Sequence, residues 1–205
     1  MRVKICGITS VNDAQHAVAA GADALGLVFY PPSPRYVESL ELAADIARAA
    51  GPFVTVVGLF VDPAPEYLNR VLAAVPLDIL QFHGNESPEF CSASGRPYLK
   101  ALRMKPSVDI AALANSYTDA RGILLDAYRK GVPGGTGETF DWAAIPHNIN
   151  APLVLAGGLT PSNIAKACAQ VGPYGVDVSG GVEATHGIKD PALVSDFITQ
   201  AKQAR

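Results

Sequence analysis

Short, mostly apolar segments recur along the chain, separated by longer segments in which apolar residues return with helical spacing. Short runs of this kind, rich in β-branched residues, are typical of strands that are covered on both faces, as in a parallel sheet. The pattern therefore predicts eight strands that alternate with helices. The strands are expected at residues 3–5, 25–29, 54–61, 79–82, 98–102, 122–125, 152–155 and 175–178.

The segments between the predicted strands carry signals for helix starts and ends. A hydroxyl or carboxylate side chain can cap the first turn, and a proline directly after it suits that turn. The expected caps are Ser10, where Asp13 completes a possible capping box, and Ser39, Ser87, Ser107, Thr160 and Asp190. Gly21, Gly51 and Gly95 follow helical patterns at the place where a left-handed residue ends a helix.

Eight strand–helix units with short connections form either a closed barrel or an open, doubly wound sheet, and periodicity alone does not decide between them. No linker, low-complexity tract or charge block interrupts the alternation. An α/β barrel of about 200 residues is built around one continuous core. We therefore expect residues 1–205 to form a single domain.

Charge and cysteine content exclude several classes of protein. The 16 basic and 19 acidic residues are spread along the chain, so no basic stripe suited to nucleic acid or an anionic membrane is visible. The N-terminal residues lack a continuous apolar run, and no segment approaches about 18 uninterrupted apolar residues, so we expect a cytoplasmic protein. The three cysteines lie far apart without CxxC spacing, which argues for reduced thiols.

Residues with chemical potential gather at the ends of the predicted strands, where a (β/α)₈ barrel builds its active site. They are found at residues 6–9, 32–35, 81–84, 126, 134–137, 156–159 and 177–183. Two of these segments, which contain Gly157-Gly158 and Gly180-Gly181, follow the seventh and eighth strands. Glycines there let backbone N–H groups approach phosphate oxygens, and two such loops favour phosphate binding over tight turns alone.

Seven segments resemble, in the same order, the signature segments of the phosphoribosylanthranilate isomerase family. They are KICGIT, GLVF followed by PPSPR, QFHG, LLDA, GGTG, LAGGL and VDVSGGVE, and they span nearly the whole chain. The resemblance implies a (β/α)₈ TIM barrel, no cofactor or metal, and a small phosphosugar substrate. It also implies an Amadori rearrangement of N-(5-phosphoribosyl)anthranilate to 1-(2-carboxyphenylamino)-1-deoxyribulose 5-phosphate in tryptophan biosynthesis.

The family's catalytic cysteine and aspartate correspond to Cys6 and Asp126 of this sequence. The chemistry needs an acid that protonates the furanose ring oxygen and a base that removes the C2′ proton, and these two side chains suffice. The substrate's own iminium holds the electrons, so no metal or pyridoxal group is required. Taken alone, Cys6 would be read as a small buried hydrophobe and Asp126 as a turn cap.

The resemblance implies further roles around this pair. Arg35 is expected to bind the anthranilate carboxylate by its planar fork, the alternative being a solvated loop arginine. Gly157, Gly158, Gly180 and Gly181 are expected to bind the phosphate. Gly180 stands where the family usually has serine, so a hydroxyl donor to the phosphate is expected to be missing. Supporting positions are His83, Gly135, Thr136, Asp177 and Ser179, and His83 is interpreted as a structural histidine rather than a proton shuttle.

Cysteines and histidines elsewhere have simpler interpretations. Cys91 and Cys168 lie within helical patterns and are expected to be buried. His16, His147 and His186 are expected at the surface. None of them is assigned to the candidate site.

Two rival functions stay open. One is a related phosphosugar isomerase of histidine biosynthesis, whose base at the first strand resembles an aspartate, so that Cys6 argues against it. The other is a non-catalytic barrel that binds a phosphorylated ligand, which would have no reason to keep both a thiol and a carboxyl group. The sequence does not decide between a monomer and a homodimer.

Overall fold

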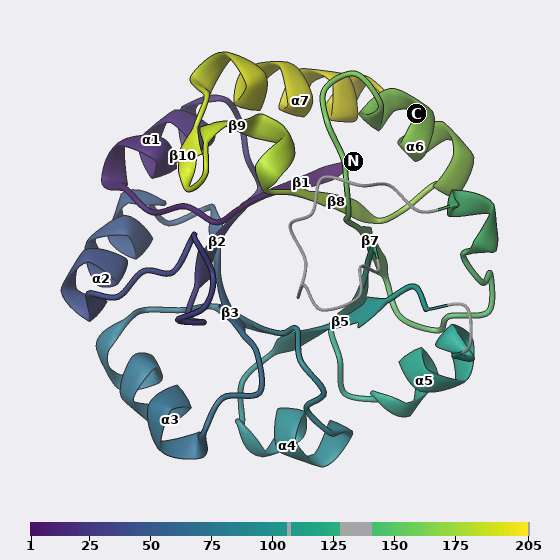
Figure 1. Ribbon diagram of the computed structural model, residues 1–205, viewed down its shortest axis with the longest axis horizontal. Helices are drawn as coiled ribbons and strands as arrows, with labels where there is room; N and C mark the ends of the chain where they lie inside the picture. The colour runs from purple at the N-terminus through teal and green to yellow at the C-terminus, as the bar shows by residue number, and fades with distance from the viewer. Residues whose placement is uncertain (106–107, 128–140, 205) are drawn as a thin grey trace.

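A computed structural model describes residues 1–105, 108–127 and 141–204. Eight parallel strands form a closed barrel in which each strand pairs with its neighbours in chain order and β8 pairs with β1 (Figure 1). The strands are β1 (Arg2–Cys6), β2 (Ala24–Val28), β3 (Thr55–Phe60), β4 (Ile79–Phe82), β5 (Tyr98–Arg103), β6 (Gly122–Asp126), β7 (Leu153–Leu155) and β8 (Gly175–Val178). Periodicity alone allowed either a closed barrel or an open sheet. The predicted closed barrel is confirmed.

Helices surround the barrel, as Figure 1 shows. They are α1 (Val11–Ala19), α2 (Leu40–Ala49), α3 (Pro65–Ala74), α4 (Pro88–Ala93), α5 (Ile110–Ser116), α6 (Ile164–Val171) and α7 (Pro191–Gln203). Short 3₁₀ turns occur at η1 (Trp142–Ala144) and η2 (Gly180–Val182), and a hairpin of β9 (Glu183–Thr185) and β10 (Ile188–Lys189) follows η2. In the described part between β6 and β7, η1 takes the place of the expected sixth helix.

Most of the predicted helix boundaries are confirmed. The side chains of Ser10, Ser39, Ser87 and Asp190 accept hydrogen bonds from the first turns of their helices. The three predicted stop glycines, Gly21, Gly51 and Gly95, have φ values of 96°, 71° and 64°. These left-handed conformations are the ones that glycine adopts at the least cost.

Two predicted caps need correction. The helix after β7 begins at Ile164 and not directly after Thr160, because Asn163 accepts a hydrogen bond from the Thr160 N–H and donates one to the Gly158 carbonyl. These two bonds hold residues 160–163 in a turn. Ser107 lies outside the described residues, and the N-cap of α5 is Asp109.

The expected capping box at α1 is also only half formed. Ser10 accepts from the Asp13 N–H, but the Asp13 carboxylate accepts a hydrogen bond from the Lys189 N–H at 3.2 Å. Asp13 therefore ties α1 to the β10 strand.

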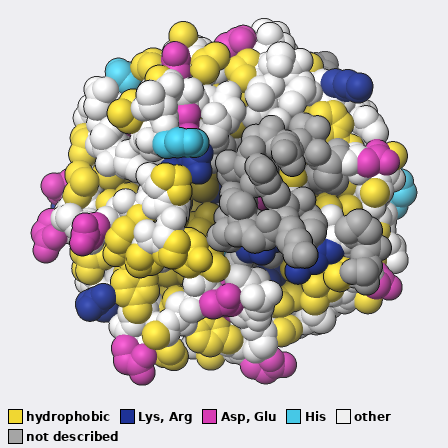
Figure 2. All heavy atoms as spheres, in the orientation of Figure 1, with side chains coloured by type: hydrophobic (Ala, Val, Ile, Leu, Met, Phe, Trp, Pro, Cys, Tyr) yellow, Lys and Arg dark blue, Asp and Glu magenta, His cyan; other side chains and the backbone are white. Residues whose placement is uncertain are grey.

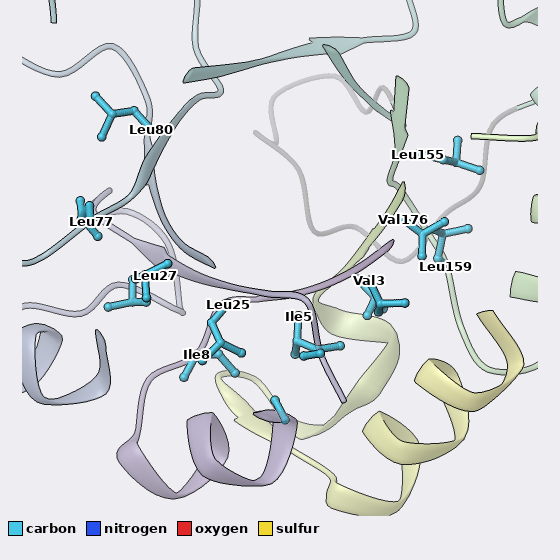
Figure 3. Close-up of a cluster of buried hydrophobic side chains, with 14 of the residues drawn as sticks. Val3, Ile5, Ile8, Leu25, Leu27, Leu77, Leu80, Leu155, Leu159 and Val176 are labelled. Carbon is cyan, nitrogen blue, oxygen red and sulfur yellow. The ribbon is translucent and has the colours of Figure 1, made fainter. Parts of the chain in front are cut away.

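The main core lies between the strands and the surrounding helices. Val3 and Ile5 on β1, with Leu25 on β2, have at most 1% of their surface exposed and point toward the helices (Figure 3). Burying a side chain of this size contributes about 1.5–3 kcal/mol. Because side chains alternate along a strand, Lys4 and Cys6 face the inside of the barrel.

No helix in residues 1–105, 108–127 or 141–204 is long and apolar enough to cross a membrane.

Candidate active site

A cavity of about 400 Å³ opens at the carboxyl ends of the strands. In the space-filling view from this end, the surface is hollowed near the centre (Figure 2). The cavity is lined by ten residues that the sequence had singled out, namely Cys6, Arg35, His83, Asp126, Gly157, Gly158, Asp177, Ser179, Gly180 and Gly181. The structure thus brings these predicted positions together. Gly135 and Thr136 lie outside the described residues.

Cys6 ends β1 and is 4% exposed, with charged side chains around it. Lys4 pairs in register with Asp177 of β8, and its Nζ lies 2.8 Å from the Asp177 carboxylate. Burial raises the pKa of the Cys6 thiol above its ordinary value of 9.0. The Lys4 ammonium lowers that pKa, Asp177 raises it and Lys189 lowers it, and the net direction is upward. The unliganded protein therefore holds Cys6 mainly as the thiol at neutral pH.

Arg35 is held by a buried carboxylate and is not a solvated arginine. Its Nε and Nη2 donate to the two oxygens of Glu183 at 2.6 and 2.7 Å, and it is 7% exposed. Lys189 Nζ also donates to Glu183, at 2.8 Å, and to the Ser179 carbonyl. Burial raises the pKa of Glu183, but hydrogen bonds from Arg35 and Lys189 outweigh it and lower the pKa. The β9–β10 hairpin thereby fixes the arginine plane.

Asp126 ends β6 and is fixed by two hydrogen bonds. Its Oδ1 accepts from the Ala127 N–H at 2.8 Å, and its Oδ2 lies 3.2 Å from Nε2 of His83. Gln81 Nε2 lies 3.0 Å from His83 Nδ1. With the Gln81 amide nitrogen as donor, Nδ1 must accept, so the His83 proton sits on Nε2 and is donated to Asp126. His83 is therefore a neighbour that orients Asp126, a contact the sequence did not predict.

Another buried ion pair supports the turn that carries His83. Lys100 Nζ lies 2.6 Å from the Glu86 carboxylate, and the two side chains are 1% and 2% exposed. Glu86 accepts from the Gly84 N–H, and Lys100 donates to the Gly84 carbonyl. Arg103 donates to the His83 carbonyl at 3.2 Å. The backbone beside His83 is thus hydrogen-bonded from both directions.

The two glycine loops approach each other closely. Gly157 and Gly158 have φ values of 84° and 63°, and a Cβ on Gly157 would lie 2.8 Å from the Asp126 carboxylate. A Cβ on Gly181 would overlap the Leu159 carbonyl oxygen. Within the described ranges, none of the N–H groups of residues 157, 158, 180 and 181 has a hydrogen-bond acceptor. This leaves backbone donors at the cavity wall, which is the arrangement that binds anions.

Ser179 adds a donor to this wall. Its hydroxyl is buried and has no hydrogen-bond partner among the described residues. A Cβ on Gly7 would lie 2.9 Å from that hydroxyl, so the residue at position 7 must be small. Gly7 also has a φ of 72°, where glycine is favoured.

Three lysines with roles around the cavity escaped the sequence analysis. Lys4 could have been found, because it stands two residues before Cys6 and therefore on the same side of the strand. Lys100 could also have been found, because it is a charged residue within the mostly apolar strand β5. Lys189 gave no signal, since its partner Glu183 belongs to a hairpin that the pattern did not predict.

Comparisons with known proteins show which family this chain resembles. The family model described as N-(5'phosphoribosyl)anthranilate (PRA) isomerase matches residues 3–200. A relative from Pseudomonas aeruginosa strain UCBPP-PA14, called N-(5'-phosphoribosyl)anthranilate isomerase, is 58% identical over all of this chain and 97% of its own. One from Cellvibrio japonicus with the same description is 57% identical, over 100% of this chain and 94% of that protein.

Solved structures show the same similarity. The phosphoribosyl anthranilate isomerase of Thermotoga maritima aligns with a TM-score of 0.90 and 43% identity over 99% of both chains. A further phosphoribosyl anthranilate isomerase, solved in complex with reduced 1-(o-carboxyphenylamino)-1-deoxyribulose 5-phosphate, aligns with a TM-score of 0.87 and 42% identity over 99% of both chains.

Proposed function

Because the chain belongs to the N-(5'-phosphoribosyl)anthranilate isomerase family, we propose that its Cys6 is the general base and its Asp126 the general acid of that reaction. The protein catalyses the Amadori rearrangement of N-(5-phosphoribosyl)anthranilate to 1-(2-carboxyphenylamino)-1-deoxyribulose 5-phosphate, a step of tryptophan biosynthesis. The observation that supports the two roles is that Cys6 and Asp126 line one cavity from β1 and β6.

Two proton transfers convert the substrate to the enolamine, and two more convert the enolamine to the ketone. Asp126 in its protonated form gives a proton to the furanose ring oxygen, the bond from that oxygen to C1′ breaks, and the ring opens to an iminium. Cys6 as thiolate then removes the C2′ proton, which leaves an enolamine. A proton then returns to C1′ while the C2′ hydroxyl gives up its own proton, which yields the ketone, so the product has the same atoms and charge as the substrate.

Arg35 is proposed to hold the anthranilate carboxylate. Glu183 occupies Nε and one N–H of Nη2. The opposite edge of the guanidinium, formed by Nη1 and the second N–H of Nη2, still offers two parallel donors that fit a carboxylate. Because Glu183 and Lys189 fix the arginine plane, this edge is oriented before substrate arrives.

The phosphate is proposed to bind at the two glycine loops. Backbone N–H groups of Gly157, Gly158, Gly180 and Gly181 and the hydroxyl of Ser179 line the same wall, and these are donors suited to a phosphate. Gly180 supplies a backbone N–H but no hydroxyl where the resemblance leads one to expect serine. A reduced affinity is the expected consequence, without loss of the chemistry.

The activity is tested with freshly generated phosphoribosylanthranilate, whose fluorescence disappears as it rearranges. The purified protein should accelerate this loss, and Cys6→Ala and Asp126→Asn should both abolish most of the acceleration. Fluorescence loss no faster than without protein, alongside tight binding of the substrate, would favour the non-catalytic barrel. Turnover of the aminated phosphosugar of histidine biosynthesis, without turnover of phosphoribosylanthranilate, would favour the related isomerase.

Further features of the protein stay predictions. We infer that residues 1–205 act as one catalytic domain, and we expect a cytoplasmic location and no nucleic-acid partner. A Thermotoga maritima relative is described as dimeric. The choice between monomer and homodimer is open to analytical ultracentrifugation of this protein.

A further inference from the structure

The layer beneath Cys6 inside the barrel contains a buried ion pair. Lys4 and Asp177 face each other across the β1–β8 ladder, and their side chains are 6% and 9% exposed. Elsewhere along the barrel strands, the buried apolar side chains of Ala101, Leu124 and Ala156 form a small cluster of their own. A buried ion pair adds little stability over an apolar pair of the same volume. Packing alone therefore does not explain why an ion pair occupies this position.

Both members of the pair act on the Cys6 sulfur. A Cβ built on Gly26 of β2 would lie 2.7 Å from Cys6 Sγ and 2.9 Å from Lys4 Nζ. The sulfur and the ammonium therefore share one small space, which exists because Gly26 has no side chain. The Lys4 ammonium favours ionisation of the thiol, and the Asp177 carboxylate opposes it.

The other charged groups near Cys6 are committed elsewhere. Lys189 of β10 and Arg35 of the β2–α2 connection both interact with the Cys6 charge, but both are bound to Glu183. Asp126 lines the same cavity from β6, where its oxygens are bonded to His83 and Ala127. Lys4 is therefore the cation placed directly against the sulfur, and Asp177 is the partner that moderates it.

We propose that the Lys4–Asp177 pair sets the ease with which Cys6 becomes a thiolate, Lys4 promoting the thiolate and Asp177 restraining it. This inference rests on the proposed role of Cys6 as general base. Lys4 and Asp177 are positioning residues, since they act through Cys6. An unpaired lysine would make the thiolate easy to form but a poor proton acceptor, whereas an unpaired aspartate would leave almost no thiolate. The pair holds the base between these limits.

The test measures the alkylation of Cys6 by iodoacetamide as a function of pH, in the full-length protein. The reagent is small enough for the cavity, and peptide masses distinguish Cys6 from Cys91 and Cys168. Asp177→Asn should lower the midpoint of alkylation by about one pH unit, which is about a tenfold larger thiolate fraction at neutral pH. Lys4→Met should raise the midpoint by a similar amount, and Lys4→Arg should leave it near that of the wild type.

The opposite signs distinguish this proposal from a structural role, because loss of packing would move both variants alike. If Lys4→Met does not fold, Lys4→Met/Asp177→Asn removes both charges, and its midpoint should lie above that of Asp177→Asn. Lys100→Met is the matched control: it breaks another buried pair away from Cys6, and it should lower the unfolding temperature while leaving the midpoint unchanged.

Midpoints that move together, or that do not move in Asp177→Asn, would overturn the proposal. Its failure is distinct from failure of the proposed function. Normal turnover by Cys6→Ala would remove Cys6 as the base, whereas the alkylation midpoints report the charge coupling whatever the role of the thiol.

Discussion

Cys6 and Asp126 line the same cavity, but their surroundings differ in kind. Around Cys6 stand full charges, with Lys4, Asp177 and Lys189 all acting on the sulfur. Around Asp126 stand hydrogen-bond donors, with His83 and the Ala127 N–H placed on separate oxygens. The proposed base, Cys6, is therefore controlled by electrostatics, and the proposed acid, Asp126, is controlled by geometry. A substitution that changes a charge should affect the Cys6 side, and one that shifts the backbone should affect the Asp126 side.

The largest effect is expected where the backbone beside Asp126 is forced to move. In Gly157→Val the side chain would be placed against Ala127 and 2.8 Å from the Asp126 carboxylate, in a backbone with φ of 84°. We expect kcat to fall by about 10²-fold or more, the range of a lost general acid. Stopped-assay kinetics measure kcat, and thermal unfolding measures the stability of the variant.

Gly172→Val is the control for backbone strain. Gly172 has a φ of 59°, but a Cβ there would meet nothing within 4 Å. Gly172→Val should therefore lower the stability of the fold and leave kcat unchanged. Equal losses of kcat in the two variants would show that Gly157 affects stability and not the position of Asp126.

A smaller effect is expected from Arg35→Lys on the Cys6 side. A lysine keeps the charge near Glu183 but cannot offer a planar fork to a carboxylate on its other edge. We expect KM to rise by about tenfold, the equivalent of one hydrogen bond to a charged group, with kcat less affected. Steady-state kinetics of Arg35→Lys and Arg35→Ala measure this. If Arg35→Ala keeps the full kcat/KM, the arginine does not bind substrate.

The smallest effect is expected at Gly180, which belongs neither to the surroundings of Cys6 nor to those of Asp126. Gly180→Ser adds a hydroxyl to the proposed phosphate wall, and one hydrogen bond to a charged acceptor is worth about 1.5–3 kcal/mol at most. The KM for the phosphosugar should stay equal or fall modestly. A higher KM would mean that the bare glycine backbone is needed at this position.

The fold was predictable because its strands are short apolar runs with clear ends. Residues 79–82 and 175–178 were predicted with the boundaries that the structure has, and Ser10, Ser39 and Ser87 cap as expected. The start of α6 was not predicted correctly, because the Asn163 side-chain amide forms hydrogen bonds to the backbone on both sides of the turn. No local pattern distinguishes that arrangement from a cap at Thr160.

The site was predictable as a set of positions and not as a set of contacts. Strand ends meet at one end of a barrel, so Cys6, Asp126 and the glycine loops could be placed together. Glu183 lies 148 positions from Arg35, its partner. Lys4 beside the thiol was not predicted, although its place two residues before Cys6 puts it on the same side of β1.

The wild-type kcat/KM is expected to depend on pH in a bell shape, and the two limbs belong to the pair of Cys6 and Asp126. A thiolate with a protonated carboxyl carries the same number of protons as a thiol with a carboxylate. The wild-type profile therefore reports the pair. Removal of one member leaves the other to titrate alone, so the variants assign the roles.

The most direct test of the account is the pH dependence of kcat/KM in Asp126→Asn and Cys6→Ala beside the wild type. Because burial raises the pKa of Cys6 above its ordinary value, the thiolate fraction increases as the pH rises into the alkaline range. Residual activity of Asp126→Asn should therefore rise with pH and lose its alkaline decline. Cys6→Ala should lose the acidic limb, and each variant should be at least about 10²-fold slower than wild type. Near-wild-type turnover by either variant, or an acidic limb that survives in Cys6→Ala, would contradict the account.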